Sequence, residues 1–210
     1  MNQHPELMNA SARRLEQLIE ERLQPGADRD RIDERIWRTF GEDCAVMFTD
    51  LSGFSRRVAR FGIIHFLQTI HESRKLLLPV VNAHDGLLLK IEGDSFLVIF
   101  RDPVRALECA VAMQRALVPA NEGRAEEDRI LLCIGLGAGR VLRIGDADVW
   151  GAEVNAASRL GEDTAQAWEI LVTEGMRVAC GEMPDISYAP IDAIPSGSNG
   201  AWRVIYRLSD

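Results

Sequence analysis

The hydrophobic residues follow two patterns that alternate along the chain. Short continuous apolar runs are typical of buried strands, and apolar residues that recur every three or four positions are typical of amphipathic helices. The apolar runs predict strands at residues 44–49, 87–91, 94–100, 130–136, 140–144, 168–173 and 202–208. The helical pattern occupies residues 11–23, 30–40, 63–83, 102–117, 152–160 and 174–180.

The order of these elements is strand, long helix, hairpin, helix, strand pair, helix and further strands. This order predicts an α+β fold with a ferredoxin-like split βαβ core, in which helices cover a mostly antiparallel sheet. We divide the chain into an N-terminal helical segment, residues 1–42, and one domain, residues 43–210. The N-terminal segment either packs on its own domain or serves as a dimer contact or a regulatory lever.

Composition argues against several classes of protein. The net charge of −8 provides no basic stripe for nucleic acid, and no apolar run is long enough to span a membrane. The four cysteines show no CxxC spacing and the four histidines form no zinc pattern. We therefore expect a cytoplasmic protein with reduced cysteines.

Residues 46–55, VMFTDLSGFS, combine a strand end with a tight turn into a helix. Such a turn points backbone N–H groups at an anion, and the carboxylate of Asp50 can hold a cation. A second carboxylate, Asp94, follows the hairpin signal at residues 92–93. Two carboxylates on neighbouring strand ends suit a pair of divalent ions, although a lone Asp at a strand end is more often a turn residue or a helix cap.

Residues 148–160, DVWGAEVNAASRL, place Asn155 and Arg159 four positions apart on a predicted helix. Side chains at that spacing project from one helix face. A surface Asn and Arg have no special role in most helices. Their position directly after an Asp-Val-Trp-Gly turn makes this pair a better candidate for function.

Three segments in order along the chain, FTDLSGFS (48–55), HDGLLLKIEGDSF (84–96) and DVWGAEVNAASRL (148–160), resemble the class III nucleotidyl cyclases. This family is the catalytic domain of most adenylate and guanylate cyclases, and the resemblance covers residues 43–208. It implies that two Mg²⁺ or Mn²⁺ ions per active site are held by Asp50, Leu51 and Asp94. It also implies that Gly53 and Phe54 lie beside the substrate in the turn.

The resemblance further implies that Lys90 and Asp148 read the purine, and that Asn155 and Arg159 orient the ribose and stabilise the transition state. In this family the active site lies at a head-to-tail dimer interface. The two metal-binding aspartates would come from one chain and the other four residues from its partner. A homodimer would then carry two equivalent shared sites.

The implied activity is an adenylate cyclase that converts ATP to 3′,5′-cyclic AMP and pyrophosphate. Adenine offers an acceptor at N1 and a donor at N6, which match the ammonium group of Lys90 and the carboxylate of Asp148. Guanine reverses both groups, and family members that use GTP typically carry Glu where Lys90 stands. The sequence therefore favours ATP over GTP.

Two alternatives remain at this stage: a cyclase for GTP or a pyrimidine triphosphate, and a non-catalytic nucleotide-binding module that dimerises. One departure from the family concerns the triphosphate. Family members often carry a Lys near the last strand, whereas residues 195–207, PSGSNGAWRVIYR, contain none. Arg203, Arg56 and Arg57 are the candidates to replace it.

Overall fold

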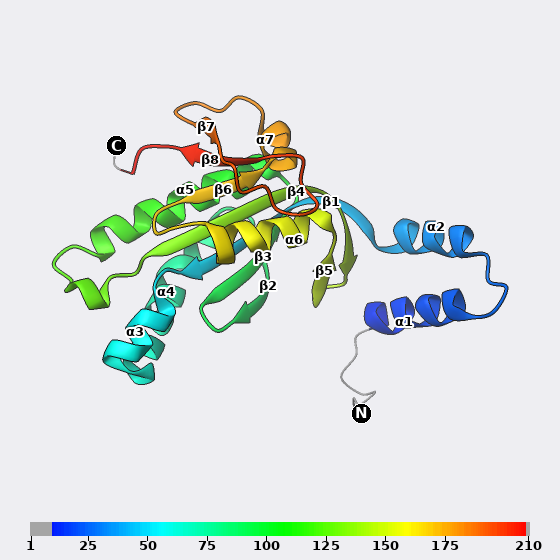
Figure 1. Ribbon diagram of the computed structural model, residues 1–210, viewed down its shortest axis with the longest axis horizontal. Helices are drawn as coiled ribbons and strands as arrows, with labels where there is room; N and C mark the ends of the chain where they lie inside the picture. The colour runs from blue at the N-terminus through cyan, green and yellow to red at the C-terminus, as the bar shows by residue number, and fades with distance from the viewer. Residues whose placement is uncertain (1–9, 209–210) are drawn as a thin grey trace.

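The structure, a computed structural model, describes residues 10–208 apart from the side chains of residues 54–57. Its centre is a sheet in the order β2-β3-β1-β4-β6-β8-β7, with β5 paired to β4 (Figure 1). The strands are β1 (Gly41–Leu51), β2 (Leu87–Glu92), β3 (Ser95–Phe100), β4 (Leu132–Ile144), β5 (Asp148–Trp150), β6 (Ile170–Thr173), β7 (Ser187–Pro190) and β8 (Ala201–Ile205). All neighbouring strands are antiparallel except β4 and β6.

The order of β4, β1, β3 and β2 in the sheet is that of a ferredoxin-like split βαβ core. The predicted α+β fold with a mostly antiparallel sheet is therefore confirmed. The helices are α1 (Ala10–Leu23), α2 (Arg29–Phe40), α3 (Phe54–Phe61), α4 (Ile63–Ala83), α5 (Pro103–Ala120), α6 (Ala152–Ser158) and α7 (Glu174–Cys180). None of the helices between residues 10 and 208 has the length and apolar character that a membrane span needs.

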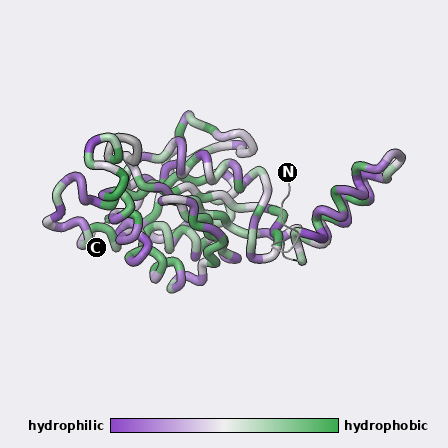
Figure 2. The backbone as a smooth tube through the Cα atoms, turned by 90° about the horizontal axis from the view of Figure 1, so that it is seen from below, coloured by the Kyte–Doolittle hydropathy of each residue, from purple (hydrophilic) through white to green (hydrophobic). Residues whose placement is uncertain are grey.

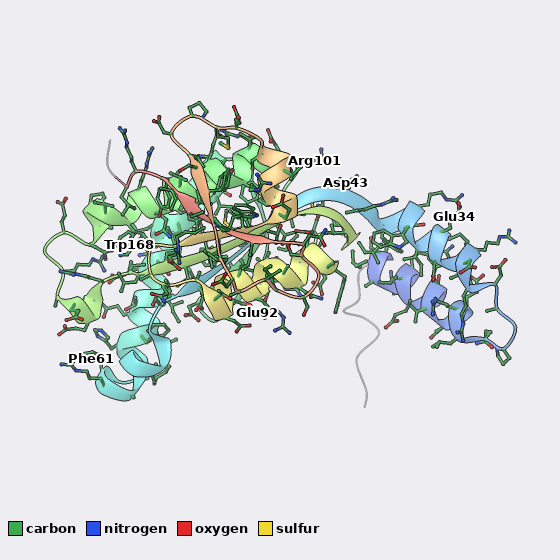
Figure 3. The ribbon with its side chains drawn as sticks, turned by 45° about the horizontal axis from the view of Figure 1, so that its top comes forward. Glu34, Asp43, Phe61, Glu92, Arg101 and Trp168 are labelled. Atoms are coloured by element: carbon green, nitrogen blue, oxygen red, sulfur yellow. The ribbon has the colours of Figure 1, made fainter. Side chains whose placement is uncertain are left out.

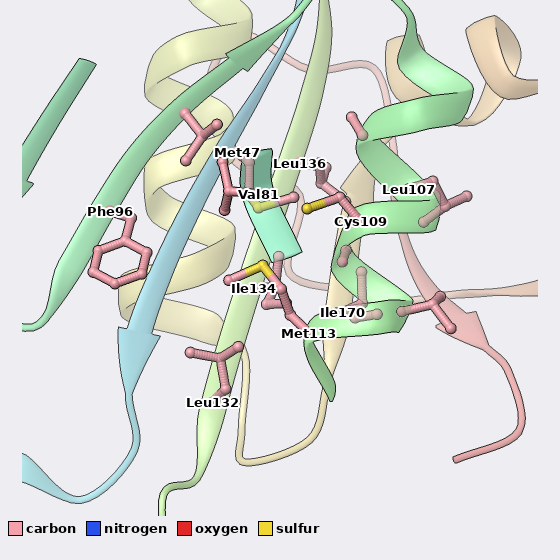
Figure 4. Close-up of a cluster of buried hydrophobic side chains, with 14 of the residues drawn as sticks. Met47, Val81, Phe96, Leu107, Cys109, Met113, Leu132, Ile134, Leu136 and Ile170 are labelled. Atoms are coloured by element: carbon pink, nitrogen blue, oxygen red, sulfur yellow. The ribbon is translucent and has the colours of Figure 1, made fainter. Parts of the chain in front are cut away.

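Alternate residues of β1 face opposite sides of the sheet, as the two-residue period of a strand requires. Ala45 and Met47 pack in the larger core, to which α4, α5 and α7 contribute. Figure 4 shows Met47 in this core together with Phe96, Leu107 and Met113. The neighbouring residues Cys44 and Val46 pack in a smaller core with Val154 of α6 on the other face. The helix that carries the predicted Asn–Arg pair therefore has one face of the sheet largely to itself.

The strand β4 corrects one prediction, because residues 132–144 form one strand where the sequence predicts two, at 130–136 and 140–144. The glycine-rich stretch between them stays in the ladder, and β4 pairs with all of β1 from Gly41↔Leu142 to Leu51↔Leu132. Two short strands were also missed. The strand β5 occupies the predicted turn after Asp148, and β7 lies inside the predicted loop at residues 184–200. Both are short and are ordered by pairing with β4 and β8 rather than by their own composition.

The helices α1 and α2 form a hairpin that projects from the body of the molecule (Figures 1 and 2). Leu18, Ile32, Ile36 and Phe40 are buried between the two helices and against Ile144 at the end of β4. Figure 3 places Glu34 of α2 far from the body of the sheet. The hairpin is therefore held at one end only, by its junction with β1 and β4.

Candidate active site

The two predicted metal-binding aspartates meet where β1, β2 and β3 end. Antiparallel pairing sets Thr49 of β1 opposite Phe96 of β3, so Asp50 follows beside Ser95 and the β2–β3 turn. The backbone N–H of Phe96 donates to Thr49 Oγ1 at 3.1 Å, and Ser95 Oγ lies 3.5 Å from Asp50 Oδ1. Strand register thus brings Asp94, which precedes Ser95, to Asp50.

The electrostatics of this pair are unfavourable without a cation. The pKa of Asp50 is raised to about 7, first by burial and then by the charge of Asp94, a hydrogen bond with Asp94 and the charge of Glu162, whereas the Leu51 N–H opposes the rise. The Oδ2 atom of Asp94 is buried and has no hydrogen-bond partner in the described part of the chain. Two crowded carboxylates with an unpartnered buried oxygen fit a divalent cation. Within residues 10–208, no three His, Cys, Asp or Glu side chains form a metal-binding group by themselves.

The turn after β1 has the predicted shape. Ser52 N–H donates to the Leu131 carbonyl at 2.8 Å, and Gly53 has a φ of +87°, a left-handed conformation that favours glycine. The helix α3 begins at the next residue, Phe54. The side chains of Phe54, Arg56 and Arg57 lie outside the described residues, so their proximity to the substrate stays a prediction.

The turn that carries Asp94 is held by a hydrogen bond that the sequence does not predict. The Nη2 atom of Arg74, on α4, donates to the Gly93 carbonyl oxygen at 2.7 Å. This contact ties the long helix to the residue directly before Asp94. No local sequence signal identifies it, because Arg74 and Gly93 lie nineteen positions apart.

Lys90 and Asp148 form an ion pair, with 2.9 Å between Lys90 Nζ and Asp148 Oδ2. Lys90 is on β2 and Asp148 begins β5, which are separate edges of the sheet. A register shift between Leu88 and Lys90 marks a bulge, a feature that redirects the side chains beyond it. Asp148 Oδ1 also accepts from the Val149 N–H at 2.9 Å, which fixes the orientation of the carboxylate.

This ion pair lines a cavity of about 190 Å³. The other lining residues are Phe48, Glu92, Ser95, Phe96, Leu97, Val149, Trp150, Val154, Asn155 and Glu162. Figure 3 shows Glu92 on the same side of the body as α6. Apolar walls and the Lys90–Asp148 pair suit a flat polar ring such as a nucleobase, and Glu92 and Glu162 add two further carboxylates. A larger hollow of about 510 Å³ lies between α1 and β4, and none of the predicted site residues line it.

Asn155 and Arg159 are both exposed, whereas Val154, Ala157 and Leu160 are buried as predicted. The helix α6 continues at Arg159 as a π-helical turn, η3 (Arg159–Thr164). A π-turn of this kind is frequent at functional sites.

The structure also brings Glu162 to the cavity, which the sequence analysis missed. Ser158 Oγ donates to Glu162 Oε2, and Glu162 lies close enough to Asp50 to raise the pKa of that carboxyl. The spacing of four between Ser158 and Glu162 was the available signal.

Arg203, the candidate replacement for a triphosphate-binding lysine, is already paired. Its Nε lies 2.7 Å from Glu169 Oε1, and β8 holds it opposite Leu171 of β6. Arg203 is absent from the lining of the cavity that contains Lys90 and Asp148. A phosphate contact by Arg203 therefore stays a prediction.

The comparison with protein families matches residues 39–192 to the adenylate and guanylate cyclase catalytic domain. Among curated proteins, a putative adenylate cyclase 3 from Rhizobium meliloti is 31% identical over 144 residues, which are 69% of this chain and 24% of that protein. The serine/threonine-protein kinase pkn2 of Myxococcus xanthus is 35% identical over 138 residues, which are 66% of this chain and 16% of the kinase. The chain thus spans a quarter or less of the length of these relatives.

Solved structures show the same fold at low sequence identity. An adenylate/guanylate cyclase/hydrolase from Silicibacter pomeroyi has a TM-score of 0.67 at 22% identity, over 80% of this chain and 98% of that one. The adenylyl cyclase CyaB from P. aeruginosa has a TM-score of 0.67 at 20% identity, over 80% and 95%. The guanylate cyclase domain of RhGC from Catenaria anguillulae, solved in complex with GTP, has a TM-score of 0.65 at 20% identity, over 79% and 97%.

Proposed function

Because the chain belongs to the adenylate and guanylate cyclase catalytic domain family, a class III nucleotidyl cyclase family, we propose that it is an adenylate cyclase. It would convert ATP to 3′,5′-cyclic AMP and pyrophosphate. The observation that carries the choice of ATP is the Lys90–Asp148 ion pair in the wall of the cavity. The two groups are held by separate strands, so one can donate to N1 and the other can accept from N6 of the same adenine.

Discrimination follows from hydrogen-bond chemistry. Adenine accepts at N1 from Lys90 and donates at N6 to Asp148, so it would satisfy both groups of the ion pair that it separates. Guanine presents a donor at N1 and an acceptor at O6. A buried polar group left without a partner costs about 1–3 kcal/mol, and two such groups discriminate strongly.

The aspartate pair supports two divalent ions, Mg²⁺ or Mn²⁺, held by Asp50, Asp94 and the backbone of Leu51. Such ions, when bound, acidify the ribose 3′-hydroxyl and neutralise charge on the departing phosphates. The unpartnered Oδ2 of Asp94 and the raised pKa of Asp50 are what this assignment rests on.

Arg159 and Asn155 supply the remaining polar contacts. The ribose 3′-oxygen attacks the α-phosphorus, and negative charge builds on the α-phosphate oxygens. The guanidinium of Arg159 donates rigid charge-assisted hydrogen bonds to those oxygens, and Asn155 orients the ribose. We propose that Arg159 and Asn155 act on the site of a partner chain, because neither aspartate lines the cavity that Asn155 shares with Lys90. Two copies head to tail would form two such sites.

Two other functions are less well supported. A guanylate cyclase is the second candidate, because the GTP-bound domain from Catenaria anguillulae shares the fold. A cyclase for a pyrimidine triphosphate and a non-catalytic dimerising module are further alternatives. Asp50, Asp94, Asn155 and Arg159 are all present, and an inactive module has no need for this complete set.

A product assay tests the proposal. The purified chain is offered ATP, GTP, CTP and UTP separately, each with Mg²⁺ and with Mn²⁺, and products are separated by chromatography. Cyclic AMP from ATP alone supports both the reaction and the base-reading pair. Another cyclic nucleotide retains the cyclase chemistry and overturns the ATP assignment. A folded dimer that makes no product in any mixture contradicts the enzyme assignment.

A further inference from the structure

The inner side of α6 carries a carboxyl group that the reaction does not use. Thr173 Oγ1, at the end of β6, donates to Glu153 Oε2 at 2.5 Å, and the backbone N–H of Ala138 on β4 also donates to this carboxylate. Thr173 Oγ1 in turn accepts from the Met176 N–H at 3.2 Å, which caps α7. A single side chain thus joins α6, β4, β6 and α7.

Three glycines make room for Glu153. A Cβ atom at Gly137 would lie 2.5 Å from the Glu153 carbonyl oxygen and 3.0 Å from Oε2. A Cβ at Gly139 would lie 3.1 Å from Glu153 Cγ, and a Cβ at Gly175 would lie 3.1 Å from Oε1. One strand, β4, and the helix α7 therefore lack side chains at the positions where Glu153 packs.

Burial of the Glu153 carboxyl opposes its ionisation. Burial raises the pKa of Glu153 above its ordinary value, and the hydrogen bonds from Thr173 and Ala138 oppose that rise. Removing a carboxyl from water is costly, and apolar side chains pack such positions at least as well. The directional hydrogen bonds of a carboxyl fix the orientation of the helix, which apolar packing does not.

The outer side of the same helix carries Asn155 and Arg159, two and six positions after Glu153. At 1.5 Å per residue, Arg159 lies roughly 9 Å along the axis from Glu153. The far end of this segment is fixed separately, because a Cβ at Gly161 would lie 2.8 Å from both the Gly135 nitrogen and the Phe48 carbonyl oxygen. This segment is therefore held against the sheet at two places, by Glu153 near its start and by the close approach of Gly161 near its end.

We infer that Glu153 is a positioning residue: its hydrogen bonds to Thr173 and Ala138 fix the tilt of α6, and so the point in space that Asn155 and Arg159 reach. This inference rests on the proposed cyclase function. A displacement of about 1 Å at a catalytic group can reduce turnover about a hundredfold. Loss of the attachment is therefore expected to lower kcat, because Arg159 acts on the transition state, and to leave the KM for ATP nearly unchanged.

The experiment compares Glu153→Met, Thr173→Val and Thr173→Ser with the unsubstituted full chain. We expect Glu153→Met and Thr173→Val each to lower kcat by about tenfold to a hundredfold with less than about a twofold change in KM. Thr173→Ser keeps the hydroxyl and should retain activity. The double variant Glu153→Met/Thr173→Val should be no worse than its worse parent, since both remove one contact.

A matched control separates positioning from general damage. Glu174→Gln alters the neighbouring carboxyl, which accepts from Arg177 of α7 and Trp202 of β8 rather than from a group on α6. It should change the melting temperature without changing kcat. A folded Glu153→Met protein with unchanged kcat, or with a loss confined to KM, overturns the inference.

Amide hydrogen exchange gives a readout that does not depend on activity. Glu153→Met should accelerate exchange across residues 152–160 by about tenfold, whereas Glu174→Gln should not. Unchanged exchange in that segment overturns the positioning role even in a chain that makes no cyclic nucleotide. An inactive unsubstituted chain, by contrast, counts against the proposed function alone.

Discussion

Lys75 and Lys90 are the only lysines in the chain, and their surroundings differ. Lys75 is exposed on α4, whereas Lys90 is paired with Asp148 in the wall of the cavity. One substitution can therefore be made at both positions, with only one of them in the proposed nucleobase site. This gives a direct test of the proposed base-reading role of Lys90.

Lys90→Glu should move the chain toward GTP, because a carboxylate at this position accepts from guanine N1 instead of donating to adenine N1. The ratio of kcat/KM for ATP to that for GTP should fall at least about tenfold. Lys75→Glu makes the same charge change on the surface and should leave the ratio unaltered. Steady-state kinetics with both nucleotides measures it, and an unchanged ratio in Lys90→Glu contradicts the base-reading role.

Asp50 predicts a pH dependence of stability in the metal-free protein. Its pKa in the folded chain is about 7, above the ordinary value of 3.8, so the unfolded chain releases its proton first as the pH rises. Folding stability should therefore fall between about pH 4 and pH 7 and stay lowered above that range. Asp50→Asn should remove this slope and stabilise the metal-free protein at pH 8 by about 1–3 kcal/mol.

Urea unfolding in the presence of a chelator measures the Asp50 effect. Asp185→Asn, at an exposed position outside the site, is the matched control and should keep the slope of the unsubstituted chain. A metal-free chain whose stability does not fall from pH 4 to pH 7 would show that Asp50 is better solvated than its surroundings indicate.

The residues predicted from the sequence are those that stand in short motifs. Asp50, Asp94, Lys90 and Asp148 were proposed in this way, and the structure brings them together in two pairs. Glu153 and Arg74 were not found, because their partners Thr173 and Gly93 lie about twenty positions away. A side chain whose role depends on such a contact has no local pattern, since any polar residue looks like a solvated one until the fold is known.

At the scale of elements, the packing of α6 and η3 on the sheet depends on glycine. A Cβ at Gly135 of β4 would lie 2.2 Å from the Ala157 carbonyl oxygen and 2.3 Å from the Gly161 nitrogen. Both neighbours are backbone atoms, which cannot rotate away as a side chain can. The helix that carries Arg159 can approach β4 this closely only because neither surface carries a side chain there.

Gly135→Ala should therefore destabilise the protein by about 2–4 kcal/mol, because the helix must move off the sheet or the strand must bend. Gly200→Ala is the control, since its Cβ would meet no atom closer than 3.4 Å, an ordinary contact. Urea unfolding of both variants gives the comparison. Equal stability of the two would mean that β4 and η3 are looser than their contacts indicate.

The hydrophobic pattern predicted which elements exist better than it predicted where they end. Long runs with a clear period, such as α4 and β1, were found because burial on one face requires that period. The single strand β4 was divided in two, because three glycines at alternate positions remove the apolar signal. They are present to admit α6 and η3, which is a tertiary reason that local composition does not contain.

At the scale of the whole molecule, the proposed dimer makes a prediction about mixtures. Asp50→Ala and Arg159→Ala should each be inactive alone. In an equal mixture that exchanges subunits, half of the dimers are mixed and one of their two sites retains both residues. The mixture should recover about a quarter of the activity of the unsubstituted chain.

The control for subunit mixing is the pair Asp50→Ala and Asp94→Ala. Both residues belong to the same half of the site, so every site in their mixed dimers lacks one aspartate and activity should stay absent. If mixed dimers of Asp50→Ala with Arg159→Ala are demonstrated by mass and remain inactive, the shared site is wrong.

The N-terminal hairpin provides a second prediction at this scale. Removal of residues 1–40 exposes Ile144 and Leu142, which Phe40 and the rest of α2 now cover. We expect the truncated chain to change in turnover, in dimerisation, or in both, as product assays and sedimentation would detect. If turnover and dimerisation are both unchanged, the hairpin has no role in either and contributes only packing.

The pairing of β1 along its whole length has a mechanical consequence. One end of the strand, Gly41, adjoins the hairpin, and Asp50 lies near the other end, about 30 Å away for nine extended residue steps. Because β4 is paired to every residue between them, we expect the two strands to move together as one rigid unit. A force applied to the hairpin would therefore tilt both strands and move the aspartates. In the proposed dimer, an input that never touches the substrate would in this way change the width of the shared cleft.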